Sequence, residues 1–368
     1  MKIGIDCREL RGQAGGFRTY LVGLLEGLTK IDTTNKYILY AYSSLDFEGI
    51  VTPTNAVFAP IGGGRLWADW VSLPKRIQMD NPDVVHFPAN YGITGVYIPT
   101  VVTLHDCISL EPQERCMCAK SRLLRKYSAI MTQRSVTRAD IVITVSNYSK
   151  EQIMRRFSCA ERIVVTHEAA RITADGEVVS TDSNEVNSQP YLLALASVDR
   201  RKNTAVVMRA FSMTRLSREK CRLVVVASHP SAKRLAEQQA VELGIQPMVD
   251  IRTGVDDLAL RRLYQNCKAF VFPSLDEGFG LPPLEAMALG AAVMSSDRAS
   301  MPEVLGDAAL YFDPTDPTDL ANKMDALIGQ EALRTHLREA GRQRAASFSW
   351  EDAARGTLGA YERAAGNT

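Results

Sequence analysis

The sequence predicts an α/β protein of two domains, each built on a parallel β-sheet flanked by helices. Short apolar runs typical of buried strands alternate along the chain with amphipathic helical stretches, which is the pattern of parallel sheets with helical crossovers. A polar segment without aromatic residues, 171–189, divides this alternation into two sets and is expected to be a linker. The chain has 368 residues, 46% of them hydrophobic, which is enough for two domains. We therefore expect one domain over residues 1–170 and another over 190–349.

The first domain is expected to begin with a strand at the start of the chain. Met1–Asp6 has too short an apolar run for the core of a signal peptide, and no stretch reaches the roughly 18 apolar residues of a membrane span. The sequence therefore predicts no targeting segment. The expected strands of this domain are Lys2–Ile5, Lys36–Tyr42, Val84–Phe87, Thr100–Leu104 and Ile141–Val145, and its expected helices include Thr19–Leu28, Arg122–Arg138 and Lys150–Phe157.

The second domain shows the same alternation after the polar segment. Ligands of open α/β sheets lie outside the carboxyl ends of the strands, so residues that directly follow strands are the first candidates for a site. The expected strands are Tyr191–Leu195, Cys221–Val226, Met248–Ile251, Ala269–Phe272 and Ala292–Met294, and helices such as Thr204–Met213 and Lys233–Leu243 lie between them.

The composition restricts the class of protein. The formal net charge is only +1, whereas a nucleic-acid partner usually leaves a strongly basic footprint, so no nucleic-acid partner is predicted. The seven cysteines form an odd set without a C-x2-C pair, which indicates neither a disulfide framework nor a zinc ribbon. A reducing cytoplasm fits this usage best.

The most informative segment is 276–288, in which Glu277 and Glu285 stand eight residues apart across a glycine-containing turn that leads into a helix. Gly278 and Gly280 allow the backbone to approach a ligand closely. The free N–H groups and the positive end of the helix dipole favour an anion such as a diphosphate. One carboxylate can then accept hydrogen bonds from a ribose diol and the other can hold a hexose hydroxyl. For two isolated glutamates, a solvated acidic loop is the alternative interpretation.

This segment resembles the E-x7-E signature of retaining nucleotide-sugar glycosyltransferases of the GT-B fold, specifically glycosyltransferase family 4. The resemblance covers almost the whole chain. It implies two Rossmann-like domains facing a central cleft, with a terminal helix, 350–368, that crosses back to the first domain. Further segments that resemble the family are Ser274–Asp276, Ser295–Asp297, Met301–Val304, Gly306–Ala309, the basic Arg201–Asn203 and the glycine pair Gly15–Gly16. The implied donor-binding residues are Gly15, Gly16, Gly278, Phe279, Gly280, Leu281 and Glu285.

Two cations follow the first strand of the second domain. Charge-assisted contacts from Arg201 and Lys202 can neutralise the charge that grows on a departing nucleoside diphosphate, a role that many enzymes give to a metal ion. An exposed basic turn is the alternative. Many relatives carry Gly-Arg or Gly-Thr shortly before this segment, whereas this chain has Ala196–Val198, which leaves the phosphate geometry open. No D-x-D motif is present, so no obligatory metal or other cofactor is expected.

The resemblance also implies a histidine at the reaction centre. His105 ends a predicted strand, where it can hydrogen-bond a donor-sugar hydroxyl and steady positive charge near the reacting carbon through its carbonyl, with Asp106 orienting the ring. Strand-end capping and a core hydrogen bond are the alternatives. His86 is expected to be structural. For Gly15 and Gly16, a plain turn is the alternative to a ligand-binding loop, and the absence of G-x-G-x-x-G counts against a dinucleotide dehydrogenase.

Two features of the first domain suggest contacts with an acceptor or a membrane. The interval 120–138 holds six cations, among them Arg122, Arg125 and Lys126, and no acidic residue. It can meet anionic lipid head groups or an acceptor diphosphate, or it can be a solvated basic face. Trp67 and Trp70 can be an acceptor platform or anchors of the core, and the core interpretation is favoured.

The predicted function is the transfer of a hexose from a nucleoside diphosphate sugar to a hydroxyl of a glycan or lipid-linked acceptor in polysaccharide biosynthesis. The resemblance implies retention at the anomeric carbon. The surroundings of His105 and Glu277 resemble those of bacterial polysaccharide mannosyltransferases, which makes GDP-mannose the first donor, with UDP-sugars and dTDP-sugars left open. The alternatives are a GT-B-fold nucleotide-sugar 2-epimerase and a non-catalytic nucleotide-sugar-binding subunit. The expected location is cytoplasmic, including a peripheral position on the inner face of the membrane.

Overall fold

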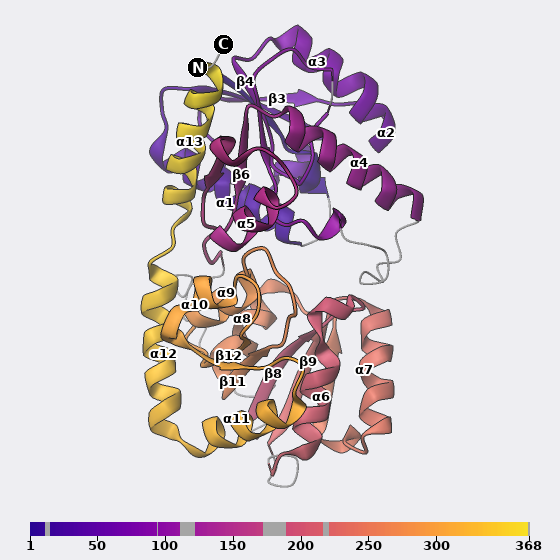
Figure 1. The fold of residues 1–368 in the computed structure, drawn as a ribbon, viewed down its shortest axis with the longest axis vertical. Coiled ribbons are helices and arrows are strands. Elements are labelled where there is room, and N and C mark those ends of the chain that lie inside the picture. The colour runs from indigo at the N-terminus through magenta and orange to yellow at the C-terminus, as the bar shows by residue number, and fades with distance from the viewer. Residues whose placement is uncertain (12–14, 94, 111–121, 172–188, 216–220, 367–368) are drawn as a thin grey trace. The chain divides into compact units, whose positions relative to one another are not determined.

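The computed structural model describes residues 1–11, 15–93, 95–110, 122–171, 189–215 and 221–366. These residues form two compact units (Figure 1). Unit 1 contains the described residues up to Ala169 together with those from Phe348 onward, and unit 2 contains those from Ala170 to Ser347. The predicted linker lies outside the described residues except at its two ends. Nothing in the described ranges forms a helix both long and apolar enough to cross a membrane.

The sheet of unit 1 has seven strands in the order β3-β2-β1-β4-β5-β6-β7, all paired in parallel. Ile3 of β1 pairs with Tyr37 of β2 on one side and with Val84 of β4 on the other. The strand order therefore reverses at β1, and such a switch point opens a crevice at the carboxyl ends of the strands. The strands are β1 Lys2–Asp6, β2 Lys36–Ala41, β3 Ala56–Pro60, β4 Val84–Phe87, β5 Thr100–Thr103, β6 Ile141–Thr144 and β7 Ile163–Val165. The five predicted strands are confirmed, and β3 and β7 are additional.

The helices of unit 1 include one from the far end of the sequence. They are α1 Gly16–Ile31, α2 Arg65–Trp67, the π-helical turn η3 Ala68–Ser72, α3 Leu73–Asp80, α4 Arg122–Arg138, α5 Asn147–Met154 and α13 Trp350–Gly366. Helix α13 packs against α1, where a Cβ on Gly23 would overlap the ring of Trp350 and one on Gly27 would overlap the Trp350 carbonyl. The two glycines allow this close approach, and the predicted return of the terminal helix is confirmed.

Unit 2 repeats the architecture with a six-stranded parallel sheet in the order β10-β9-β8-β11-β12-β13. Its strands are β8 Tyr191–Ala196, β9 Arg222–Ala227, β10 Val249–Thr253, β11 Ala269–Phe272, β12 Val293–Ser296 and β13 Ala309–Phe312. Its helices are α6 Thr204–Met213, α7 Pro230–Glu242, α8 Asp257–Asn266, α9 Leu281–Ala288, α10 Met301–Leu305, α11 Pro317–Gly329 and α12 Glu331–Ala346. Strands β8 and β11 are neighbours, so the loops that follow them begin at the same edge of the sheet.

The remaining short turns complete the connections. They are η1 Arg8–Arg11, η2 Ser44–Phe47, η4 Ile108–Leu110, η5 Ala160–Arg162, η6 Arg200–Lys202, η7 Gln246–Met248 and η8 Gly306–Ala308. Each sheet is buried by side chains such as Val85 and Val102 in unit 1 and Val225 and Val271 in unit 2, all of which are at most 2% exposed. The burial of such side chains, about 1.5–3 kcal/mol each, holds the strand ends that carry the candidate residues.

Candidate functional site

The loop between β11 and α9 carries the E-x7-E segment of unit 2. Gly280 lies directly before α9 with φ of +107°, in the left-handed region that favours glycine, and a side chain there would also collide with Met301. Pro282 and Pro283 occupy the first turn of the helix, where a missing N–H is not needed. The prediction of a glycine-containing turn that leads into a helix is confirmed.

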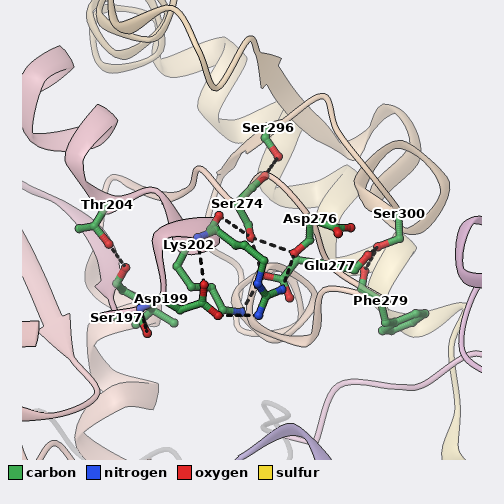
Figure 2. A network of polar contacts seen from close by, with 12 residues as sticks. Ser197, Asp199, Lys202, Thr204, Ser274, Asp276, Glu277, Phe279, Ser296 and Ser300 are labelled. Atoms are coloured by element: carbon green, nitrogen blue, oxygen red, sulfur yellow. Dashed lines mark hydrogen bonds and ion pairs between the residues drawn. The ribbon is translucent and has the colours of Figure 1, made fainter. Parts of the chain in front are cut away.

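Lys202 and Glu277 meet at this edge of the sheet (Figure 2). The Lys202 Nζ is 2.6 Å from Oε1 of Glu277, and the Ser274 hydroxyl donates to the same oxygen at 2.5 Å. The Lys202 ammonium also lies 5.7 Å from the centre of the Phe272 ring. The two charged side chains are 31% and 14% exposed, so the pair is partly open to solvent. Because β8 and β11 run side by side, residues 75 positions apart in the sequence form one site.

Arg201 joins the two loops rather than extending freely from one. Its guanidinium donates to the Asp199 carboxylate at 2.5 Å and to the Asp276 carbonyl at 3.1 Å, while its own carbonyl accepts from the backbone N–H of Leu275. Asp199 in turn accepts from the backbone N–H of Arg201 at 3.0 Å. Arg201 therefore holds the β8 loop in register with the β11 loop, close to Lys202.

Two serines that sequence reasoning gave no role support the glutamate loop. The buried Ser300 hydroxyl lies 2.9 Å from both the Glu277 and the Phe279 carbonyl oxygens, and Ser296 Oγ donates to the Ser274 carbonyl at 2.5 Å (Figure 2). Ser296 lies in a segment that resembles the family and Ser300 lies next to one, so the resemblance could have pointed to both. Their hydroxyls fix the backbone that presents Glu277.

Glu285 lies one turn into α9, as predicted. It is half-buried, and its charge acts on the fully buried hydroxyl of Tyr264. Burial, reinforced by the charge of Glu285, raises the pKa of Tyr264 well above its usual value. Leu281, the first residue of this helix, is also half-buried, whereas Phe279 is buried.

In unit 1, His105 is held by four hydrogen bonds. Its Nδ1 lies 3.1 Å from Oε1 of Glu168 and its Nε2 lies 2.9 Å from the Pro88 carbonyl oxygen. Its backbone N–H donates to Asn90 Oδ1 at 2.8 Å, and its carbonyl accepts from Ser149 Oγ at 2.9 Å. The ring nitrogens are therefore both engaged with the protein, which leaves neither for the predicted bond to a sugar hydroxyl.

The expectation that Asp106 orients His105 is wrong. Asp106 Oδ1 accepts a hydrogen bond from the backbone N–H of Ile108, and the carboxylate at the ring is that of Glu168. The side chain two residues before an N–H readily closes this local turn, which competes with a contact to the neighbouring ring. Sequence reasoning missed Glu168, which follows the three-residue strand β7.

The pKa values of the two buried histidines of unit 1 are shifted in opposite directions. Burial acts to lower the pKa of His105, but the hydrogen bond and the charge of Glu168 outweigh it and raise that pKa above its usual value. His86 contacts two hydroxyls instead, at 2.8 Å each, from Tyr361 and Thr103. Burial, reinforced by the charge of His105, lowers the pKa of His86 to about 3. The prediction that His86 is structural agrees with this closed, neutral environment.

The glycine pair lies where α1 begins. Gly15 has an extended backbone and precedes the helix, and Gly16 is its exposed first residue, with no atom within 4 Å of a Cβ placed there. The next residue, Phe17, places its ring 5.1 Å from that of His105. The start of α1 and His105 are thus brought together within unit 1.

The core interpretation of Trp67 and Trp70 is wrong, since they are 59% and 51% exposed. The buried positions of this helical stretch are instead Ala68 and Asp69. Asp69 accepts from Arg8 and from the Tyr127 hydroxyl, each at 2.8 Å, so a charged group takes the inner position because it is fully paired. Of the predicted membrane cations, Lys126 is exposed and Arg125 is half-buried, and the side chain of Arg122 lies outside the description.

No group of three or more histidine, cysteine, aspartate or glutamate side chains is placed to hold a metal ion in the part of the chain that the structure describes.

Comparison with solved structures identifies the class of fold. Sucrose-phosphate synthase from Thermosynechococcus elongatus superposes with a TM-score of 0.79 at 18% identity, over 100% of both chains. The Anabaena protein Alr3699/HepE, solved with UDP and glucose, superposes with a TM-score of 0.74 at 16% identity, over 98% of both chains. These neighbours define the GT-B fold, in which the predicted pair of Rossmann-like domains is confirmed.

Sequence comparison then gives the family. The model "Glycosyltransferase Family 4" matches residues 14–170, and the model "Glycosyl transferases group 1" matches residues 177–344. Together they cover most of the chain, which belongs to the GT-B glycosyltransferases of family 4.

The curated relatives include bacterial mannosyltransferases. The serotype-specific mannosyltransferase WbdA of Escherichia coli is 30% identical over 322 residues, which are 82% of this chain and 39% of WbdA. The O-antigen chain mannosyltransferase B of Escherichia coli is 28% identical over 299 residues, 77% of this chain and 75% of that protein. The chain spans less than half the length of the first curated relatives it matches.

Proposed function

We propose that this protein transfers a hexose from a nucleoside diphosphate sugar to a hydroxyl of a glycan or lipid-linked acceptor in polysaccharide biosynthesis. The observation that carries the proposal is the Lys202–Glu277 pair, held 2.6 Å apart at the carboxyl edge of the unit 2 sheet beside the start of α9. A cation, a carboxylate and a helix N-terminus are the groups that a sugar diphosphate requires.

The proposed roles follow from the hydrogen-bond donors and acceptors that each side chain keeps after its contacts within the protein. Lys202 has three N–H donors, and its contact with Glu277 uses one, so the ammonium can also contact a diphosphate oxygen and stabilise the leaving group. Arg201 adds positive charge nearby while keeping the two loops together. Glu277 accepts a hydrogen bond from the hexose and Glu285 accepts hydrogen bonds from the ribose. The backbone of Gly278, Phe279, Gly280 and Leu281 lies against the ligand.

For the reaction itself we propose same-face transfer with retention, without an obligatory metal or other cofactor. The cations Arg201 and Lys202 supply the charge that a metal ion would otherwise bring to the diphosphate. A donor phosphate oxygen accepts the proton of the incoming hydroxyl. Gly15 and Gly16 admit the donor at the start of α1.

GDP-mannose is the proposed donor, because the relatives named mannosyltransferases span most of this chain. A thermal-shift panel of GDP, UDP, dTDP and ADP tests it, since a ligand that binds only the folded state raises the melting temperature. We expect the largest rise with GDP. A larger rise with UDP, the nucleotide bound by the Anabaena neighbour, would replace GDP-mannose with a UDP-sugar.

Product analysis separates the proposed function from its alternatives. Purified protein incubated with donor and a glycan acceptor is expected to yield a new glycosidic bond with the anomeric configuration of the donor. Formation of a free sugar epimerised at carbon 2 would indicate a 2-epimerase. Binding of the nucleotide sugar without any turnover would indicate a non-catalytic subunit.

We further propose an anionic membrane surface as a partner, with the protein on the cytoplasmic face. Leu66, Trp67 and Trp70 are exposed on α2 and η3, and the Tyr127 hydroxyl of α4 donates to Asp69 between them. Leu123, Leu124 and Ile130 of α4 lie three or four positions from Tyr127, and Arg134 lies seven positions away, so these four share its side of the helix. Lys126, the residue before Tyr127, is also exposed. We call the following set the apolar–basic surface: Leu66, Trp67, Trp70, Leu123, Leu124, Lys126, Ile130 and Arg134. Exposed tryptophan and leucine beside exposed cations suit a lipid interface.

A further inference from the structure

The oxygen partners of His105 determine which of its nitrogens carry protons. The Pro88 carbonyl can only accept a hydrogen bond, so Nε2, at 2.9 Å from it, carries a hydrogen. An ionised Glu168 also can only accept, so Nδ1, at 3.1 Å, carries a second hydrogen. With both nitrogens donating, the ring is an imidazolium.

Burial makes the two charges depend on each other. The side chains of His105 and Glu168 are 9% and 5% exposed, and an unpaired charge in such a position is costly. Loss of the Nδ1 proton would leave a buried carboxylate facing a nitrogen lone pair. The pair therefore keeps its proton, in line with the raised pKa of His105.

The other titratable groups around the ring do not replace Glu168. Tyr20 of α1 contacts the ring edge-on at 4.6 Å, and burial raises its pKa to about 12, so it is neutral. His86 of β4 is neutral as well. Asp106 carries a charge that adds to the positive shift at His105, but its carboxylate accepts from Ile108. Helix α5 contributes the hydroxyl of Ser149, which donates to the His105 carbonyl.

We propose that Glu168 is a positioning residue of the transfer reaction, and this rests on the proposed function. By pairing with the doubly protonated ring, Glu168 locks His105 so that its backbone carbonyl is held in one place at the end of β5. The ring is thus an anchor and not a general base. The carbonyl accepts from Ser149 and keeps a second acceptor position for positive charge near the reacting carbon.

The protonation state can be tested without any substrate. In protein labelled with ¹⁵N at histidine, we expect both ring nitrogens of His105 to be N–H at pH 8. Glu168→Gln should convert His105 to one N–H, whereas Glu168→Asp and Asp106→Asn should keep both. A neutral His105 in the wild-type protein, or a doubly protonated ring in Glu168→Gln, would overturn the proposal.

Kinetics test the positioning role. Glu168→Gln is expected to lower kcat at least tenfold with little change in the donor KM, because the lock acts on the transition state, and Glu168→Asp should recover part of the loss. Lowering the pH from 8 to 6 should raise the kcat of Glu168→Gln relative to that of the wild type, because the His105 ring of the variant regains its second proton. A folded Glu168→Gln enzyme with wild-type kcat would reduce Glu168 to a structural residue. Absence of transfer by the wild-type protein would overturn the proposed function instead. The NMR measurement would still show whether the His105 ring is doubly protonated.

Discussion

Unit 1 and unit 2 each carry a cation–carboxylate pair beyond the carboxyl end of a parallel strand, but only one of the two pairs is open. The His105–Glu168 side chains are 9% and 5% exposed, and both ring nitrogens lie within hydrogen-bonding distance of protein oxygens. The Lys202–Glu277 side chains are 31% and 14% exposed, and the ammonium keeps donors beyond its contact with Glu277. A closed pair can only hold geometry, whereas an open pair can exchange or extend its contacts toward a ligand.

The free-energy cost of removing one partner is also expected to be larger for the buried pair than for the open pair. Removing one partner of a buried pair typically costs about 3–5 kcal/mol, because it leaves an uncompensated charge. A solvent-exposed pair contributes about 0–1 kcal/mol, and the partly exposed Lys202–Glu277 pair lies between the two limits. We therefore expect substitutions at the Lys202–Glu277 pair to destabilise the fold less than substitutions at the His105–Glu168 pair.

The largest effect is expected for Lys202→Ala. Loss of a cation that stabilises the leaving diphosphate should lower turnover at saturating donor by about 10²–10³, with a smaller change in binding of the free nucleoside. Steady-state kinetics and calorimetry measure the two quantities. Lys233→Ala is a matched control, because Lys233 pairs with Glu237 on the surface of α7. Equal turnover in Lys202→Ala and wild type would rule out the open pair as the leaving-group site.

A smaller effect is expected from the apolar–basic surface of unit 1. Changing Lys126 and Arg134 to serine removes two exposed cations, each contributing roughly 1 kcal/mol near an anionic membrane, so vesicle partitioning should weaken about 30-fold. Sedimentation with acidic vesicles measures this, and the difference should shrink with added salt. Lys233→Ser with Arg342→Ser in unit 2 provides the same charge change elsewhere. Equal partitioning of the two double variants would contradict the membrane proposal. It would favour a solvated basic face on α4 and a soluble acceptor.

The smallest effect is expected for Glu285→Gln. Loss of a charged hydrogen-bond acceptor costs on the order of 1.5–3 kcal/mol, so the dissociation constant of the nucleoside diphosphate should rise about tenfold or more. Calorimetry on folded protein measures it, with Glu242→Gln as an exposed carboxylate control in the same unit. Unchanged affinity would remove Glu285 from the ribose site and shift the binding role of unit 2 to the Lys202–Glu277 pair.

The sequence was most informative where local pattern and chemistry coincide. The loop from Asp276 to Leu281 could be predicted because its glycines, prolines and flanking strand each restrict the backbone in a known way. Both segments are predicted to follow strands, but the contact between Lys202 and Glu277 is not predicted, because it depends on β8 and β11 being neighbours in the sheet.

Contacts between distant residues could not be predicted in the same way. His105 has a carboxylate as its next neighbour in the sequence, yet its partner is Glu168, 63 residues away. Nothing local distinguishes the two acids, since the choice depends on where β7 delivers Glu168 and on the turn that takes up Asp106. The prediction of core positions for Trp67 and Trp70 is wrong for a related reason. The buried position between them is filled by Asp69, whose partners Arg8 and Tyr127 come from other elements.

The contact between α13 and α1 has a consequence for how the chain is made. Gly23 and Gly27 receive Trp350, so the first unit is complete only after residues from 348 onward have left the ribosome. The intervening residues of unit 2 are contiguous and can fold beforehand, which reverses the usual order of N-terminal domain first. During synthesis Gly23 and Gly27 of α1 therefore lack their contact with Trp350 for more than three hundred residues of elongation. The helix that completes unit 1 is therefore synthesised only after the residues of unit 2.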